Sequence, residues 1–214
     1  MKLFLLGATG RTGKWVLQEA LKRNHEVVCL SRNVERLGKH VNLIVIEGSP
    51  TKLEDVEKAI AGCDVIVSVL NVSRKSDFPW ARLRTPPTFL SDTINNLIQT
   101  VEPSKRIVIC SAWGVAETKK DLPSWFRWFI DNSNIGVAYK DHERQEQLLE
   151  KSKLDWTFVR PVGLTNGRRK KVQESFNNEP RPSLLISRKS VANYLLDCLE
   201  KPELIHKKIV ISNR

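Results

Sequence analysis

The stretch Met1-Lys-Leu-Phe-Leu-Leu-Gly-Ala-Thr-Gly-Arg-Thr-Gly-Lys-Trp-Val16 decides the fold that this sequence predicts. The apolar run Leu3–Leu6 is long enough for a short buried strand and too short for a helix. The glycine loop Gly7–Gly13 follows it, and an apolar helical pattern starts at Trp15. A glycine-rich turn between a strand and a helix is typical of dinucleotide-binding sites, although the spacing here is G-x-x-G-x-x-G rather than G-x-G-x-x-G.

Each glycine of this loop has a separate task in such a site. One allows the tight turn, one lets backbone N–H groups approach the pyrophosphate, and one lets the helix pack closely on the strand. The N-terminus of the helix adds free N–H groups and a partial positive charge. The loop therefore predicts a bound dinucleotide, and a glycine loop without a cofactor is the alternative.

The rest of the chain alternates apolar strands with amphipathic helices. Strands that are apolar throughout are buried on both faces, which is typical of a parallel sheet covered by helices. We therefore predict an α/β fold, a doubly wound Rossmann sheet in three α/β/α layers, as a single domain over residues 1–214 with small substrate-side insertions. Further strands are expected at 26–31, 41–47, 64–70, 106–110, 155–160 and 208–212, helices at 53–60, 88–101, 137–151 and 188–200, and a long loop at 163–182.

The loops at the carboxyl ends of the strands indicate which cofactor is bound, because ligands of this architecture lie there. An NAD-specific site would usually carry a carboxylate after the second strand, for the ribose 2′-hydroxyl. The first carboxylate after that strand is Glu35, whereas Arg32 and Arg36 offer guanidinium groups suited to a 2′-phosphate. NADP(H) is therefore favoured over NAD(H), with plain surface charge as the alternative explanation of both arginines.

The composition limits the class of protein. A length of 214 residues suits one α/β domain, and the net charge of +11 would suit an anionic ligand, a nucleic acid, a membrane surface or simply a solvated basic surface. The basic run Arg168–Lys171 has no nucleic-acid-reading motif beside it, so nucleic acid is disfavoured. No apolar run approaches the ~20 residues of a membrane helix. The four cysteines are far apart and lack metal-ligand spacing, so we expect reduced thiols, a cytoplasmic protein and no metal site.

Several motifs together resemble the atypical branch of the short-chain dehydrogenase/reductase superfamily. The branch includes NAD(P)H-binding proteins similar to biliverdin-IXβ/flavin reductase and NmrA-like proteins. The motifs are the glycine loop, Ser31-Arg32, Ser111-Ala112, Tyr139-Lys-Asp-His-Glu143, the segment Glu146–Pro161 and the tail Ile186–Ala192. The resemblance covers nearly the whole chain and implies NAD(P) binding, but it does not specify a reaction.

The sequence departs from the wider superfamily at the catalytic Tyr-x-x-x-Lys pair. With the register fixed by Glu146-Gln-Leu-Leu149, His142 stands at the Lys position and Ala138 at the Tyr position, while Tyr139 is about 100° away around a helix. The resemblance implies instead a reductase that relies on cofactor placement and on a serine after the fifth strand, here Ser111. Ser111 and His142 are therefore the candidate catalytic residues; a serine that caps the strand and a hydrogen-bonded His142–Glu146 pair are the structural alternatives.

These observations predict an NADPH-dependent oxidoreductase that transfers hydride to a small planar or carbonyl acceptor, such as a flavin or a quinone. The alternative is an NADP(H)-binding redox sensor that regulates a protein partner, and either would be a monomer or a small homo-oligomer.

The rings of Trp113, Trp125, Phe126, Trp128 and Phe129 would form an apolar wall over the nicotinamide, unless 122–130 is an amphipathic helix with its rings on the sheet. The residues expected at the cofactor are Gly7, Ala8, Thr9, Gly10, Arg11, Thr12, Gly13, Ser31, Arg32, Arg36, Gly48, Ser49, Leu70, Asn71, Ser111, Ala112, Pro161, Val162, Gly163 and Leu164.

Overall fold

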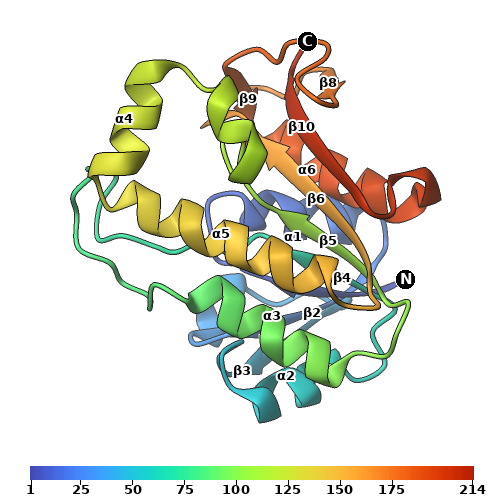
Figure 1. The fold of residues 1–214 in the computed structure, drawn as a ribbon. Helices are drawn as coiled ribbons and strands as arrows, with labels where there is room; N and C mark the ends of the chain where they lie inside the picture. The colour runs from blue at the N-terminus through green and yellow to red at the C-terminus, as the bar shows by residue number, and fades with distance from the viewer.

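The computed structural model describes residues 1–214 and contains a central sheet of eight strands with helices on both faces (Figure 1). The strand order is β3-β2-β1-β4-β5-β6-β10-β8, and all neighbours are parallel except β10 and β8. This is the doubly wound sheet that the sequence predicts. The strands of the sheet are β1 (Lys2–Leu6), β2 (Glu26–Ser31), β3 (Leu43–Glu47), β4 (Val65–Ser68), β5 (Arg106–Cys110), β6 (Asp155–Pro161), β8 (Val172–Ser175) and β10 (Lys207–Asn213).

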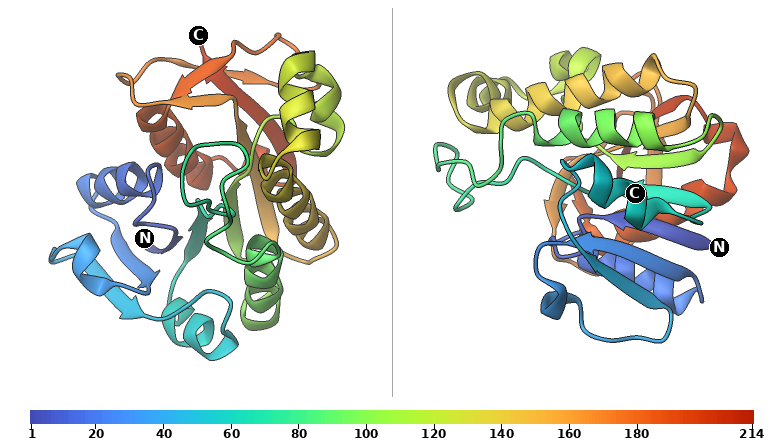
Figure 2. Two further views of the ribbon diagram at one scale, coloured as in Figure 1. Left: turned by 90° about the vertical axis from the view of Figure 1, so that its left-hand side faces the viewer. Right: turned by 90° about the horizontal axis from the view of Figure 1, so that it is seen from below.

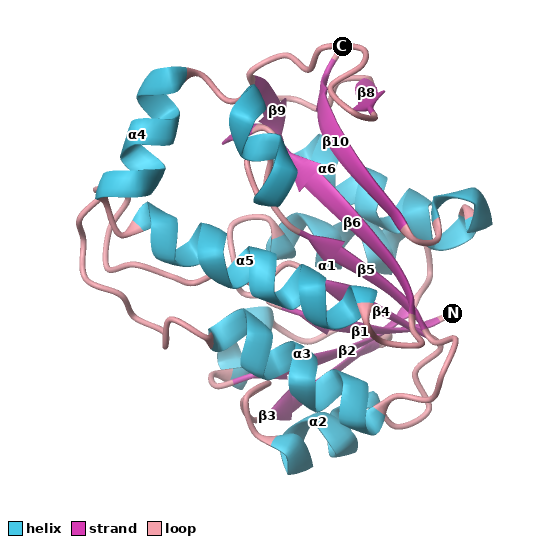
Figure 3. Ribbon diagram, viewed as in Figure 1, coloured by secondary structure: helices cyan, strands magenta, loops and turns pink.

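Helices cover the two faces of the sheet as separate layers (Figure 3). Helices α1 and α6 contact each other on one face, while α3 packs between α2 and α5 on the other. Helix α4 lies beyond the sheet and packs against α5. The helices are α1 (Gly13–Lys22), α2 (Leu53–Ile60), α3 (Phe89–Thr100), α4 (Ser124–Asn132), α5 (Ile135–Glu150) and α6 (Arg188–Asp197), with 3-10 turns at Val34–Leu37, Ala116–Asp121, Cys198–Glu200 and Pro202–Leu204.

The first strand shows why an uninterrupted apolar run is needed in the middle of the sheet. Successive side chains of a strand point to opposite faces. Leu3 and Leu5 belong to the core under α1 and α6, whereas Phe4 and Leu6 belong to the core under α2 and α3. All four are fully buried, because both faces of β1 are covered.

The sequence-based expectations are wrong at several element boundaries. The segment 163–182 is not a continuous loop: it contains β7 (Gly163–Thr165), which pairs with β9 (Leu185–Ser187), and β8 at the edge of the main sheet. Strands at a sheet edge or in a side sheet are not buried on both faces and need no continuous apolar run. The polar sequence of this segment therefore gave no strand signal. The third strand begins at Leu43 rather than Val41, and the helix expected at 188–200 ends at Asp197.

The carboxyl ends of the strands form the edge at which the expected ligand would bind. A long segment, residues 71–87, leaves β4 and crosses the middle of this edge before α3 begins (Figure 2, left).

All four cysteines are buried thiols. None of the helices has the length and apolar character required to span a bilayer.

Candidate functional site

A cavity of about 840 Å³ lies at the carboxyl edge of the sheet, where the loops after β1, β4, β5 and β6 meet. Its walls run from the glycine loop to the first turns of α5, so one space connects both ends of the predicted site. Six cationic side chains but only one carboxylate, Asp77, line it. Of the residues predicted from the sequence, the cavity is lined by Gly7, Thr9, Gly10, Arg11, Thr12, Arg32, Leu70, Asn71, Ser111, Ala112, His142, Pro161, Val162, Gly163 and Leu164.

Six of the predicted residues do not line this cavity: Ala8, Gly13, Ser31, Arg36, Gly48 and Ser49. The Ser31 hydroxyl makes a local turn, in which it donates to the Asn33 carbonyl (2.9 Å) and accepts from the Asn33 N–H (3.2 Å). The Ser49 N–H donates to Asp55 (2.8 Å), and a Cβ at Gly48 would lie 2.8 Å from the same carboxyl group. Gly48 and Ser49 therefore serve the junction between β3 and α2.

The glycine loop has the geometry of an anion cradle. Gly7 has φ +87°, a conformation that L side chains rarely adopt, and a Cβ at Gly13 would lie 2.0 Å from the Gly7 oxygen. The N–H groups of Arg11, Thr12 and Gly13 donate to no protein acceptor, and no side chain caps the start of α1. These free donors fit a dinucleotide pyrophosphate, because a helix N-terminus with open N–H groups is a natural site for phosphate.

The cations at this end of the cavity differ in how they are engaged. Arg11 makes a two-pronged ion pair with Asp77 of the 71–87 segment (2.8 and 2.9 Å), and the Arg11 guanidinium lowers the pKa of Asp77. Arg32 lines the cavity without any hydrogen bond or ion pair to the protein, whereas Arg36 is exposed outside it. Of these three arginines, Arg32 is the one that lines the cavity without a protein partner.

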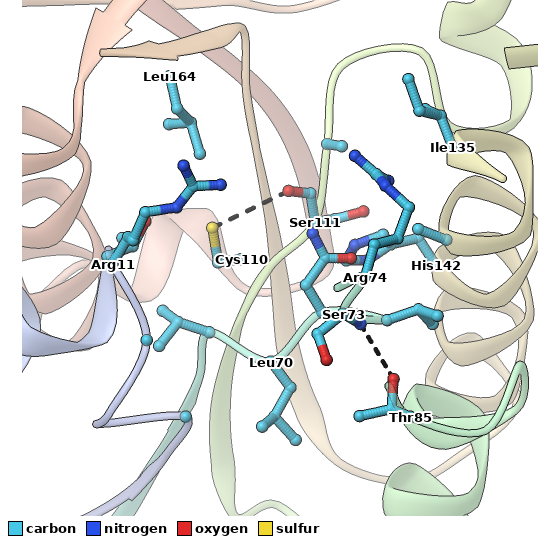
Figure 4. A pocket seen from close by; sticks show the side chains of 18 of the residues that line it. Arg11, Leu70, Ser73, Arg74, Thr85, Cys110, Ser111, Ile135, His142 and Leu164 are labelled. Atoms are coloured by element: carbon cyan, nitrogen blue, oxygen red, sulfur yellow. Dashed lines mark hydrogen bonds between the residues drawn. The ribbon is translucent and has the colours of Figure 1, made fainter. Parts of the chain in front are cut away.

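Two residues that line the cavity carry buried donors without partners, and Figure 4 shows one of them, Ser111, between Arg11 and His142. The Ser111 backbone is anchored to β6 by a hydrogen bond to the Val159 carbonyl (2.8 Å), but its Oγ is buried with no hydrogen-bond partner. The indole Nε1 of Trp113 is also buried and has no hydrogen-bond partner. Unsatisfied buried polar atoms are costly, and both of these belong to residues that line the cavity.

Helix α5 presents Ala138, Tyr139 and His142 to the cavity. Burial, with a smaller contribution from Arg160, lowers the pKa of His142 to about 4, so the ring is neutral at pH 7. Gln145 Nε2 lies 2.6 Å from His142 Nδ1. With the amide nitrogen as donor in this contact, Nδ1 accepts and the proton of the neutral ring is assigned to Nε2. His142 can therefore donate a hydrogen bond, but it holds no imidazolium proton. The Tyr139 hydroxyl donates to the Trp113 carbonyl (3.2 Å), and burial raises its pKa.

The expected hydrogen bond between His142 and Glu146 is absent, because Arg160 occupies both oxygens of Glu146. Arg160 is 1% exposed; its Nε donates to Glu146 (3.1 Å), its Nη2 makes a shorter contact with the same carboxylate, and its Nη1 donates to Glu117 (2.6 Å). Burial alone would lower the pKa of Arg160, but the two carboxylates outweigh it and raise the pKa. This buried pair ties β6 to α5 below the cavity.

The aromatic cluster only partly forms the expected wall. Trp113 and Phe126 line the cavity, and Phe126 contacts the Tyr139 ring edge-on (6.3 Å between centroids). Trp125 and Trp128 are 61% and 55% exposed, so α4 does not place its rings on the sheet either. The helix packs on α5 at the rim of the fold, where only one of its faces can be covered.

The sequence interpretation missed Arg188 and the part of the 71–87 segment that follows Asn71 as parts of the site. Ser73, Arg74, Lys75, Ser76, Asp77, Arg84 and Thr85 all line the cavity. The available signal was their place directly after a strand whose carboxyl end faces the ligand edge. Arg188, within the tail motif Ile186–Ala192, also reaches the cavity and donates to Asn166 (2.8 Å).

Known proteins are similar to this chain along nearly its whole length. The protein YwnB of Bacillus subtilis is 24% identical over 213 residues, which cover 95% of this chain and 94% of YwnB. A short-chain dehydrogenase/reductase from Veillonella parvula in complex with NADP matches with a TM-score of 0.79 at 17% identity, over 99% of this chain and 94% of that one. The anaerobilin reductase ChuY of Escherichia coli O157:H7 matches with a TM-score of 0.79 at 19% identity, over 100% and 97% of the two chains.

At these identities the structural matches show the fold, which is that of the short-chain dehydrogenases/reductases. The sequence itself matches a family model described as NAD(P)H-binding over residues 7–202, a span that begins at the glycine loop and ends after α6. The free N–H groups of that loop fit the cofactor that the description names. The chain belongs to this NAD(P)H-binding family.

Proposed function

We propose that this protein is an NADPH-dependent reductase that transfers hydride to a small planar or carbonyl acceptor. The observation that carries the proposal is the single cavity that begins at the glycine loop and continues to Ser111, Trp113 and Phe126. A dinucleotide held at the loop would extend toward Ser111, and the apolar rings and free donors beyond it would then contact the acceptor. The NADP complex of the Veillonella protein, which has the same fold, supports this placement.

The preference for NADPH over NADH rests on Arg32. Its guanidinium is unpaired and lines the cavity after β2, where the ribose 2′ position is expected. No carboxylate lines this end of the cavity except Asp77, which Arg11 already engages. A free arginine without a competing carboxylate favours a 2′-phosphate over a 2′-hydroxyl.

The side chains near Ser111 would orient the acceptor rather than supply acid chemistry. The bound cofactor supplies the hydride. Ser111 Oγ and the Nε2–H of neutral His142 can donate hydrogen bonds to an acceptor carbonyl, and these bonds strengthen as hydride transfer places negative charge on its oxygen. A flavin or a quinone tolerates the missing acid because its reduced anion can take its proton from water.

The decisive experiment compares NADPH and NADH binding by quenching of tryptophan fluorescence in Arg32→Ala and in the wild type. We expect the dissociation constant for NADPH to rise about 10- to 100-fold in the variant, the usual worth of a charge-assisted hydrogen bond, and that for NADH to stay unchanged. Arg36→Ala is the matched control, because Arg36 is exposed outside the cavity. Equal losses for both nucleotides would show that Arg32 does not read the 2′-phosphate.

A redox-sensing regulator is the second candidate, and the exposed rings of α4 favour it. Trp125 and Trp128 lie on the helix whose Phe126 lines the cavity, and an exposed apolar patch of this kind can contact a protein partner. Turnover separates the two functions. Oxidation of NADPH with flavin or quinone acceptors supports the reductase, whereas tight NADPH binding with no turnover of any acceptor supports the sensor.

A further inference from the structure

The guanidinium of Arg74 is an unengaged cation inside the cavity. It lines the cavity, its Nε is buried without a partner, and the side chain makes no hydrogen bond or ion pair with the protein. A buried guanidinium nitrogen without an acceptor costs free energy that a bound anion would recover. The fold therefore keeps Arg74 in a position that a ligand would stabilise.

The backbone around Arg74 is held in place. Arg74 pairs with Leu83 in an isolated antiparallel bridge, the Arg84 N–H donates to the Ser73 carbonyl (2.8 Å), and the Ser73 N–H donates to Thr85 Oγ1 (3.0 Å). The 71–87 segment is therefore folded into a short hairpin near its start. Arg74 is presented to the cavity from this hairpin rather than from a free loop.

Arg74 lies on the Ser111 side of the cavity, across from Arg11, and its charge helps to lower the pKa of Asp77, the partner of Arg11. In Figure 4 its side chain reaches toward the side of Ser111, His142 and Ile135, whereas Arg11 lies on the opposite wall beside Leu164. The proposed donors for the cofactor phosphates are the glycine loop and Arg32. Arg74 is therefore surplus to the needs of the cofactor.

We infer that Arg74 forms an anion subsite for the acceptor, so that the preferred substrates of this reductase carry a carboxylate, sulfonate or phosphate group. The planar guanidinium can bind such a group through two parallel hydrogen bonds. Trp113 and Ser111, which also line the cavity, each carry a buried donor without a protein partner. This inference rests on the proposed reductase function. It adds a charge requirement to a site that otherwise offers apolar rings and neutral hydrogen-bond donors.

The test is a pair of acceptors that share a ring and differ in charge: naphthoquinone and naphthoquinone sulfonate. Hydride passes from NADPH to the quinone and a proton comes from water, which leaves NADP⁺ and the hydroquinone. We expect Arg74→Gln to raise KM for the sulfonate about 10- to 100-fold and to leave KM for the neutral quinone and the dissociation constant of NADPH unchanged. Arg82→Gln is the matched control, because Arg82 is an exposed arginine of the same hairpin outside the cavity.

A binding measurement keeps the inference testable without turnover. Naphthalene sulfonate and neutral naphthol are titrated into the NADP⁺ complex, with quenching of tryptophan fluorescence as the readout, since Trp113 lines the cavity. Wild-type protein should bind the sulfonate more tightly than the naphthol, and Arg74→Gln should remove that difference. Equal loss of both ligands, or a weaker NADPH complex in Arg74→Gln, would overturn the subsite and assign Arg74 to the cofactor. If neither quinone is reduced but the sulfonate preference holds, the reductase proposal fails while the subsite stands.

Discussion

Gly13 shows how a single atom decides whether the cofactor loop can form. A Cβ at this position would lie 2.0 Å from the Gly7 oxygen and 2.7 Å from its carbonyl carbon. Both atoms are backbone, so no side-chain rotation can relieve the contact. Glycine is required here because the start of α1 packs directly on the turn after β1.

We expect Gly13→Ala to lower the free energy of unfolding by about 1–3 kcal/mol and to abolish NADPH binding, because the loop must shift to accept the methyl group. Urea unfolding and fluorescence titration measure the two effects. Gly167→Ala is the control, since its Cβ would meet only the Thr165 hydroxyl at 3.5 Å. Unchanged NADPH binding in Gly13→Ala would mean that the loop does not hold the cofactor.

Ser111 is the residue at which orientation of the acceptor can be tested separately from cofactor binding. Its backbone is fixed by β6 and its hydroxyl is free, so Ser111→Ala removes a donor and little else. We expect kcat/KM for a quinone acceptor to fall about tenfold, the usual worth of one hydrogen bond, with the dissociation constant of NADPH unchanged. Steady-state kinetics would contradict the assignment if kcat/KM stayed at the wild-type value.

At the scale of elements, the buried Arg160–Glu146 pair joins a central strand to the helix that carries His142. Both side chains are almost fully buried, at 1% and 2% exposure. A buried ion pair adds little net stability compared with an apolar pair, but removal of one partner leaves an unpaired charge in the core. The pair therefore fixes the position of α5 on β6, and through it one wall of the cavity.

We expect Arg160→Met to cost about 3–5 kcal/mol of the free energy of unfolding, because Glu146 is left buried without its partner. The double variant Arg160→Met/Glu146→Leu should lose less than the sum of the two single variants. Glu150→Gln is the control in the same helix: its partially exposed ion pair with Lys208 should be worth no more than about 1 kcal/mol. Additive losses in urea unfolding would show that the two residues are not coupled.

Elements also differ in how well the sequence predicts them. Strands β1, β2 and β5 are continuous apolar runs, and the structure confirms them at or within one residue of the expected bounds. Strands β7 and β8 are polar and lie at an edge or in a side sheet, so no periodic apolar pattern marks them. Their hydrogen bonds come from partners that are distant in sequence, and a local pattern does not contain that information.

At the scale of the whole molecule, burial of His142 makes stability depend on pH. The pKa of His142 is about 4 in the fold against an ordinary 6.5, so the unfolded chain takes up a proton first as the pH falls. The neutral state of His142 therefore stabilises the fold fully above pH 6.5. This stabilisation, on the order of 3 kcal/mol of the free energy of unfolding, is lost as the pH falls from 6.5 to about 4.

His142→Gln tests this, because glutamine cannot take up a proton. The free energy of unfolding of the wild type should fall by about 2–3 kcal/mol more than that of the variant between pH 7 and pH 4.5. Carboxylates also titrate in this range, but they do so in both proteins, so only the difference between the two urea-unfolding profiles matters. Parallel profiles would show that His142 is not held neutral by the fold.

The sequence by itself determined the fold class, the glycine loop, the ligand edge and the absence of the Tyr-x-x-x-Lys pair. Those features depend on residues that are close together in the chain, namely apolar runs, turns and helical spacing. They were enough to predict a parallel sheet and to expect the ligand at the carboxyl ends of its strands, where the structure has its cavity.

Only the tertiary structure decided which side chains in that crevice are free. Arg11 and Arg32 look alike in the sequence, but Arg11 forms an ion pair with Asp77, whereas Arg32 has no partner in the protein. Glu146 is hydrogen-bonded to Arg160, and His142 contacts Gln145 instead. The hairpin at 71–87 brings Arg74 into the cavity. Each of these outcomes depends on a partner distant in sequence or on burial, and both are properties of the packed chain rather than of any local pattern.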